Sequence, residues 1–141
     1  HDRYANVETA YLLQQVEEYE GVCILATNLL QNIDAAFMRR ISFVIHFPFP
    51  DKETRAKLYR SMLPPEVPVS DNIDFDFMAE KFEITGGSIK NIVVNAAFLA
   101  AAKGVPLGME ELLVAAVNEL RKNEIVVVKK DLGEYADLVF K

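Results

Sequence analysis

The sequence has a single cysteine, Cys23, among its 141 residues. One cysteine cannot form an internal disulfide, so a reducing, cytoplasmic compartment is the simplest expectation, with Cys23 in the core. No apolar run approaches the roughly 18 residues that a membrane-spanning helix needs, so no such helix is predicted. The sequence opens on His1 without an initiator methionine or a signal-like segment, and we expect a cut inside a longer protein or a processed form.

Basic charge is scarce, above all in the second half. The net charge is −6: residues 1–62 carry 7 basic and 8 acidic side chains, and residues 63–141 carry 8 and 13. This balance makes a nucleic-acid partner improbable. A helix-turn-helix DNA binder in residues 75–122 is disfavoured, because Lys90 is the only basic residue between Lys81 and Lys103. The two histidines lack ligand spacing and neighbouring cysteines, so no metal site is predicted.

The first fifty residues have the pattern of an α/β unit. Residues 6–21 carry a wide apolar stripe that predicts a helix, and residues 33–40 predict a short second one. The apolar runs VCILAT (22–27) and FVIHF (43–47) are typical of strands buried on both faces. Strand, helix and strand in this order predict a right-handed crossover in a parallel sheet.

The rest of the sequence predicts helices only. Asp51 is the expected N-cap of a helix over residues 51–63, and PPEVPVSDN (64–72) has the composition of a linker. Further helices are predicted at 74–82, 86–104 and 108–124, with a weak last one at 130–140. A domain boundary is therefore expected near residues 48–51.

Polar residues with possible phosphate chemistry follow the first predicted strand. Asn28 stands at its carboxyl end, where open parallel sheets bind ligands, and an amide there can donate to a phosphate oxygen and accept from a water. The alternative is that Asn28 closes a turn. Arg39 and Arg40 end the short helix. They either complement the helix dipole as solvated surface residues or reach the nucleotide of a neighbouring subunit.

Taken together, these segments resemble the AAA+ ATPases. Residues 2–49 are similar to the second region of homology of that family, with ILATN resembling its sensor-1 strand. The segment NIDAAFMRRISFVIHFPFP is similar to the arginine-finger segment of members with two consecutive arginines, such as the microtubule-severing and membrane-remodelling proteins. ITGGSIKNIVVNAAFLAA resembles the sensor-2 helix of the lid. The resemblance covers roughly residues 2–103, and the order and spacing of its motifs make it specific.

The resemblance implies a fold and its boundaries. It implies an α/β remnant of the parallel sheet of a P-loop NTPase in residues 1–50, namely the C-terminal part of the nucleotide-binding domain. An all-α lid would follow in residues 51–125 and a C-terminal extension in residues 126–141.

The resemblance also implies roles for four residues of the first segment. Asn28 would orient the hydrolytic water. Arg39 and Arg40 would act in trans on the ATP of the next protomer, and Arg3 would lie at the subunit interface.

Three lid residues would lie at the nucleotide. Gly86 and Gly87 would let the backbone approach the adenine and ribose, or would simply form a helix-start turn. Lys90 stands where other branches of the family have a sensor-2 arginine. As a lysine it would either contact phosphate or remain solvated.

Two motifs of the family are absent. The sequence has no GxxxxGK[ST] segment and no apolar strand ending in paired Asp-Glu to hold Mg²⁺. The chain alone is therefore expected neither to bind ATP tightly nor to hydrolyse it. The complete protein would use ATP and Mg²⁺ in a ring, expected to be a hexamer, that remodels an unidentified macromolecular substrate. The alternative is a non-catalytic, AAA-like helical interaction module.

Overall fold

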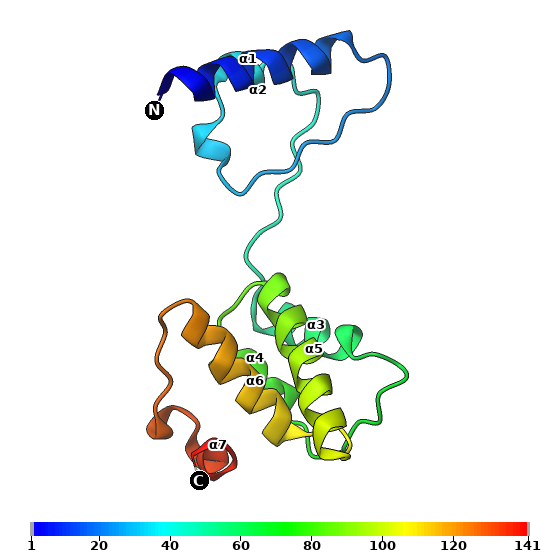
Figure 1. Ribbon diagram of the computed structural model, residues 1–141, viewed down its shortest axis with the longest axis vertical. Coiled ribbons are helices and arrows are strands. Elements are labelled where there is room, and N and C mark those ends of the chain that lie inside the picture. The colour runs from blue at the N-terminus through cyan, green and yellow to red at the C-terminus, as the bar shows by residue number, and fades with distance from the viewer. Residues whose placement is uncertain (1, 141) are drawn as a thin grey trace. The chain divides into compact units, whose positions relative to one another are not determined.

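The computed structural model describes the backbone of residues 2–140 and, in that range, the side chains other than those of residues 2–6, 9 and 32. The chain divides into two compact units, His1–Phe47 and Pro48–Lys141. Each unit is considered by itself below (Figure 1). The described residues form helices and connecting segments and contain no strand.

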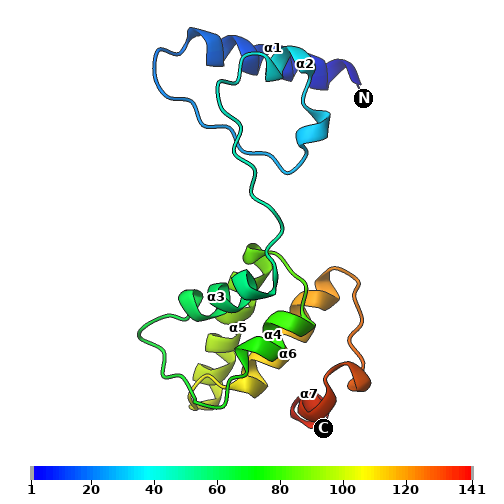
Figure 2. The ribbon, with the colours of Figure 1, turned by 180° about the vertical axis from the view of Figure 1, so that it is seen from behind.

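The first unit contains one long helix and one short one. Helix α1 spans Asp2–Glu18, where the apolar stripe predicts a helix, and helix α2 spans Ala35–Met38. A 3-10 turn, η1 (Leu30–Asn32), precedes α2, which lies beside α1 (Figures 1 and 2). The apolar stripe of α1 is only partly covered, because Val7 and Tyr11 are exposed.

The predicted sheet remnant does not form in this structure. Residues 22–27 and 43–47 are irregular, and no backbone hydrogen bond joins them within the described part of the chain. Ile24 and Phe43 are each 88% exposed, and Cys23 is an exposed free thiol instead of the core residue expected. The physical reason is that an apolar strand is stable only when neighbours satisfy its backbone and cover both faces. The single long helix of this unit does not cover both segments.

The second unit is built mainly from four helices longer than one turn. These are α3 (Lys52–Met62), α4 (Phe75–Lys81), α5 (Gly86–Lys103) and α6 (Met109–Lys122). Asp51 caps α3 as the sequence predicts, since its carboxylate accepts from the Thr54 N–H at 2.8 Å. The buried Arg55 of α3 donates from Nε to the Ala79 carbonyl at 2.8 Å and from Nη1 to that of Pro50 at 2.6 Å. These bonds fix the start of α3 to α4.

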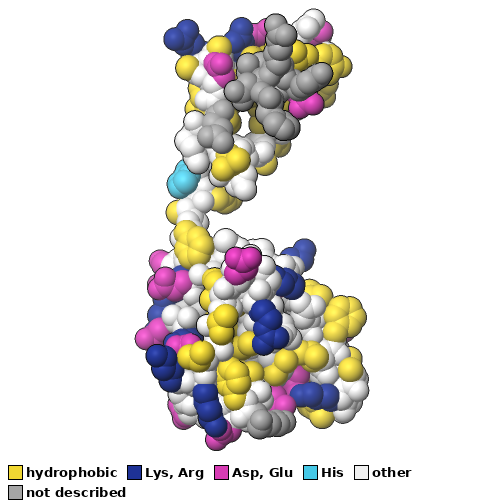
Figure 3. Space-filling view, turned by 60° about the vertical axis from the view of Figure 1, so that its left-hand side comes forward, with side chains coloured by type: hydrophobic (Ala, Val, Ile, Leu, Met, Phe, Trp, Pro, Cys, Tyr) yellow, Lys and Arg dark blue, Asp and Glu magenta, His cyan; other side chains and the backbone are white. Residues whose placement is uncertain are grey.

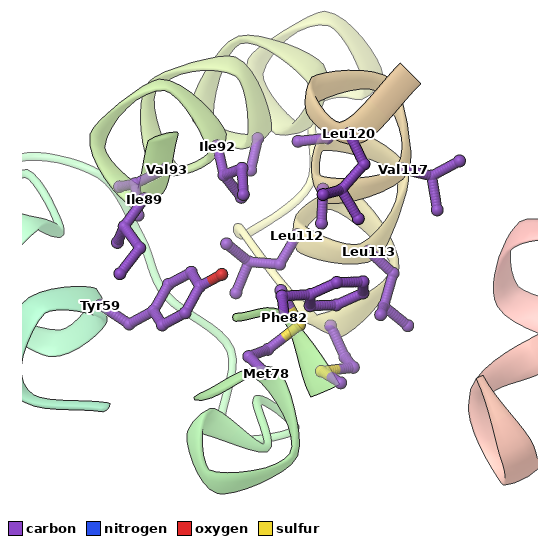
Figure 4. Packing of buried hydrophobic residues seen from close by; sticks show 14 of the residues in the cluster. Tyr59, Met78, Phe82, Ile89, Ile92, Val93, Leu112, Leu113, Val117 and Leu120 are labelled. Carbon is purple, nitrogen blue, oxygen red and sulfur yellow. The ribbon is translucent and has the colours of Figure 1, made fainter. Parts of the chain in front are cut away.

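The core of this unit lies where α5 and α6 pack together, with α3 and α4 packed against it (Figures 2 and 4). Small residues on the facing sides of both helices, among them Ala96 and Ala116, are fully buried and allow close approach. The large fully buried side chains are Tyr59, Met78, Ile89, Ile92, Leu107, Met109, Leu112, Leu113, Leu132 and Val93. At about 1.5–3 kcal/mol for each large side chain, this burial is the main stabilising term of the unit.

The predicted linker is bound to the helices. Leu107 donates its N–H to the Pro68 carbonyl and accepts from the Ser70 N–H, each at 2.8 Å, which gives one isolated parallel bridge. Asn72 accepts from the Met109 N–H at 3.1 Å and so caps α6 from outside that helix. A Cβ on Gly108 would lie 3.0 Å from Asn72 Oδ1, so glycine permits this close approach.

The C-terminal tail, residues 127–140, packs onto the helical unit. It forms two 3-10 turns, η2 (Lys129–Asp131) and η3 (Gly133–Tyr135), and helix α7 (Ala136–Val139). Gly133 has a φ of +53°, which interrupts the single helix that the sequence predicts over 130–140. Leu132 is fully buried, and the Tyr135 hydroxyl donates to the Asp74 carboxylate at 3.0 Å.

We expect the tail to contribute to the stability of the unit. Leu132→Ala should lower the free energy of unfolding by about 2–5 kcal/mol, because it leaves a cavity in the shared core. Urea unfolding followed by circular dichroism measures this. Val126→Ala is the control: Val126 is 78% exposed, and its truncation should change stability by about 0.5 kcal/mol or less. Equal effects of the two variants would show that the tail is not part of the core.

The tail also connects stability to pH. The Phe77 backbone N–H and, after it, the Tyr135 hydroxyl lower the pKa of Asp74. The folded pKa lies below the unfolded one, so the unfolded state binds more protons in acid. The Asp74 contribution is therefore present above the unfolded pKa and lost as pH falls through the folded one. Tyr135→Phe should reduce this loss of stability as pH falls below the ordinary aspartate pKa of 3.8, measured by urea unfolding at each pH. An unchanged pH profile would contradict the role of the hydroxyl.

Candidate functional site

Asn28 lies at a bend directly after the extended apolar segment. Its side chain is exposed and makes no hydrogen bond to any other described residue. The turn is held by the neighbouring Thr27, whose hydroxyl accepts from the Leu29 N–H at 3.0 Å. The Asn28 amide is thus not needed to close the turn, and its donor and acceptor are both available to a ligand.

Helix α2 presents the two arginines. The Asp34 carboxylate accepts from the Ala36 N–H at 2.5 Å and caps the helix start. Phe37 is only 6% exposed and anchors the helix in the first unit. Arg39 follows as the C-cap residue, with its backbone N–H bonded to the Ala35 carbonyl at 3.2 Å. A cap, one apolar anchor and the terminal arginines therefore make up this short element.

The two guanidiniums have different surroundings. Arg40 donates from Nε to the Glu17 carboxylate of α1 and from Nη1 to the Ala36 carbonyl at 2.8 Å. Arg39 is exposed, and its guanidinium has no hydrogen-bond or ion-pair partner among the described residues. One arginine is therefore held against the protein, and the other faces solvent.

Gly86 and Gly87 form the first turn of α5. Thr85 caps that helix, its hydroxyl accepting from the Ser88 N–H at 3.2 Å. A Cβ on Gly86 would lie 3.6 Å from Leu58 Cδ1, and one on Gly87 would lie 3.8 Å from Thr85 Oγ1. These are ordinary contact distances, so the fold itself tolerates a side chain at both positions.

Lys90 follows one turn later on the exposed side of α5. Nearby basic residues of the unit are mostly paired: Lys57 with Glu53 at 2.6 Å, and Lys122 with Glu119 at 2.6 Å. Figure 3 shows acidic and basic side chains interspersed over the face it draws. Lys90 has no such pairing with another described residue, which leaves its ammonium solvated.

Two residues remain to be placed, Arg3 and Glu17. The side chain of Arg3 lies outside the described residues. Glu17 was not anticipated, because nothing in the local sequence separates it from Glu18 or Glu20, and its partner is 23 residues away. Only the pairing of α1 with α2 identifies it.

Two other kinds of feature are absent from the described part of the chain. No three His, Cys, Asp or Glu residues there are grouped to hold a metal ion. No helix among the described residues is long and apolar enough to cross a membrane.

Comparison with known proteins identifies the chain as a homologue of AAA+ ATPases. It is 28% identical to the proteasome-activating nucleotidase of Saccharolobus solfataricus over 137 residues, which cover 89% of this chain and 35% of that protein. It is 30% identical over 129 residues to the 26S proteasome regulatory subunit 4 homolog B of Arabidopsis thaliana, over 86% of this chain and 28% of that subunit.

A third relative is the katanin p60 ATPase-containing subunit A1 of Strongylocentrotus purpuratus, 35% identical over 83 residues, or 58% of this chain and 16% of that protein. The chain thus spans about a third or less of the length of these relatives. No protein-family model matches it. The resemblance read from the motifs is confirmed at the level of the family.

The glycines at the start of α5 allow a direct test of whether the fold requires them. Gly87→Ala should raise the free energy of unfolding by about 0.5 kcal/mol, because alanine loses less backbone entropy in a helix and meets no clash. Gly104→Ala is the matched control. Gly104 lies at the end of the same helix with φ +67°, so alanine there should lower the free energy of unfolding by roughly 1 kcal/mol. Thermal unfolding compares the two, and destabilisation by Gly87→Ala would mean that the turn itself needs glycine.

Proposed function

We propose that this chain is the sensing and trans-acting part of an AAA+ ATPase that couples ATP hydrolysis to the remodelling of a macromolecule. The observation that carries the proposal is the exposed guanidinium of Arg39 at the end of α2, directly beside Arg40; the Arg39 guanidinium has no partner among the described residues. The relatives support it, since by name they are a nucleotidase, an ATPase subunit and a proteasome regulatory subunit.

The arginines would act on the nucleotide of a neighbouring subunit. During transfer of the γ-phosphoryl group, negative charge spreads over its equatorial oxygens, and a guanidinium beside them stabilises that charge. The planar fork of arginine matches phosphate oxygens better than the point charge of lysine. Because the Arg39 guanidinium has no hydrogen-bond or ion-pair partner among the described residues, none of these contacts has to break when it reaches a neighbour.

Asn28 would position the water that attacks the phosphorus. Its amide group can donate to a γ-phosphate oxygen while its carbonyl accepts from that water. The exposed position at a bend supports this role, because the Asn28 amide makes no hydrogen bond to another described residue.

The start of α5 would contact the rest of the nucleotide. Gly86 and Gly87 tolerate a Cβ in the fold, so close approach of an adenine and ribose gives them a reason to be glycines. In the complete protein, Gly87→Ala would then weaken nucleotide binding while stabilising the helix. Lys90 would supply a positive charge nearby without the planar fork of an arginine.

The described residues fit a nucleotide only in part. They offer a guanidinium, an amide and a helix start, whereas the sequence has no GxxxxGK[ST] segment and the described residues have no metal-ligand cluster. The phosphates and Mg²⁺ would be held by residues outside these 141. Alone, the chain should therefore neither bind ATP tightly nor hydrolyse it.

Action in trans requires a closed ring, because every arginine pair must face a nucleotide on the next subunit. We propose a cytoplasmic ring, a hexamer, with Arg3 at its subunit interface. The substrate to be remodelled is a macromolecule whose class these residues do not specify.

In the complete protein, Arg39→Ala with Arg40→Ala should lower kcat for ATP hydrolysis by about 10³- to 10⁵-fold, because the charge on the transferring phosphoryl is no longer stabilised. The dissociation constant for ATP, measured by calorimetry, should stay nearly unchanged. A matched control is Lys129→Ala with Lys130→Ala, another adjacent cation pair, which should leave kcat intact. Unchanged turnover in the arginine variant would overturn the trans-acting role of the arginines, whereas an absence of turnover in the unaltered complete protein would favour the non-catalytic interaction module.

A further inference from the structure

The ion pair between Glu17 and Arg40 divides the two adjacent arginines into different classes. Arg40 uses Nε on Glu17 and Nη1 on the Ala36 carbonyl, so its guanidinium spans from α1 to α2. Arg39, one residue earlier, makes no such contact within the described residues and is exposed. Sequence alone gives no way to rank the two.

We propose that Glu17 is a positioning residue: it holds Arg40 as a brace between α1 and α2, so that Arg39 alone acts as the trans-acting arginine. This inference rests on the proposed function and refines it. It assigns different roles to two neighbouring residues that the motif treats alike.

The hydrogen-bond inventory of arginine supports the division. A guanidinium has five N–H donors and binds phosphate best through two parallel ones on a single edge. In Arg40 the Nε edge faces the Glu17 carboxylate. Binding phosphate through that edge would require release of Glu17, whereas Arg39 has every edge available.

Charge supports the same division. The carboxylate of Glu17 offsets the positive charge of Arg40, so an incoming phosphate meets a nearly neutral pair there. At Arg39 no described carboxylate pairs with the guanidinium, and the phosphate meets a full positive charge.

The location of Glu17 has no explanation within its own helix. It lies in the last turn of α1, where the helix dipole disfavours a carboxylate. Its neighbour Glu18 accepts from Gln14 Nε2 at 2.7 Å, one turn earlier on α1, and so has a partner in the same helix. Glu17 instead bonds across to Arg40, which places the C-terminal end of α2 against α1 and sets where Arg39 points.

The decisive experiment measures steady-state ATP hydrolysis by the complete protein in four variants. Arg39→Ala should lower kcat by about 10³-fold or more with the KM for ATP nearly unchanged. Arg40→Ala and Glu17→Gln should each lower kcat only about two- to fivefold, the effect expected from losing one exposed ion pair. Their combination should lower kcat no further, because both variants remove the same brace.

Three more variants separate positioning from a general effect on charge or folding. Glu18→Gln removes a neighbouring carboxylate that does not touch Arg40 and should leave kcat unchanged. The exchanged pair, Glu17→Arg with Arg40→Glu, should recover most of the activity that Glu17→Arg alone loses. An equal loss in Arg39→Ala and Arg40→Ala, or an added loss from Glu17→Gln in the Arg40→Ala background, would overturn the division.

A spectroscopic measurement on the 141-residue chain tests the brace without ATP. In ¹H–¹⁵N NMR, Glu17→Gln should shift the Nε–Hε signal of Arg40 and leave that of Arg39 in place. A shift of neither signal would overturn the brace even if the arginines matter for turnover. Turnover unaffected by either arginine would overturn the proposed function and this refinement together, whatever the NMR result.

Discussion

The close contact between α5 and α6 is the interaction on which the helical unit depends. Alanines on the facing sides bring the helices together, and Ile92 and Leu112 fill the space where α3 and α4 approach (Figure 4). The remaining features attach to this pair. The segment before α4 binds the α5–α6 loop through Leu107, and the tail covers the core with Leu132. The buried core thus holds α5 in place, and the exposed first turn of that helix therefore has a defined position in the unit.

The first unit shows the opposite constraint. Its two apolar segments would be strands if other strands lay beside them, because an extended backbone must find hydrogen-bond partners and its side chains must be covered. The described residues supply neither, and the segments stay irregular and exposed. What holds this unit is local: the Asp34 cap, the buried Phe37 and the ion pair between Glu17 and Arg40. Asn28 and Arg39 are not among these contacts, and their side chains make no hydrogen bond to another described residue.

Sequence reasoning succeeded where the signal is local. The cap at Asp51 and the apolar pattern of residues 86–104 depend on residues within a few positions, and helices α3 and α5 form where the sequence predicts them. It failed where the outcome depends on distant partners. The strands needed neighbours, Asn72 reaches α6 from what seemed a linker, and Glu17 pairs with an arginine 23 residues away. The break of the last helix at Gly133 was a local signal that could have been read from the glycine itself.

The residues proposed to act on the nucleotide share one property: the fold does not explain them. Gly86 and Gly87 accept a Cβ without a clash, Asn28 does not hold its own turn, and Arg39 binds nothing within the described chain. Residues that break local rules without a structural gain are expected to gather at functional sites. Arg40 differs, since the brace to Glu17 already accounts for it. An exposed arginine loses side-chain entropy of up to about 2 kcal/mol when it is immobilised, so contact with a highly charged phosphate must offset that loss. The brace limits this cost by fixing the backbone from which Arg39 extends, so that only the side chain itself remains to be ordered.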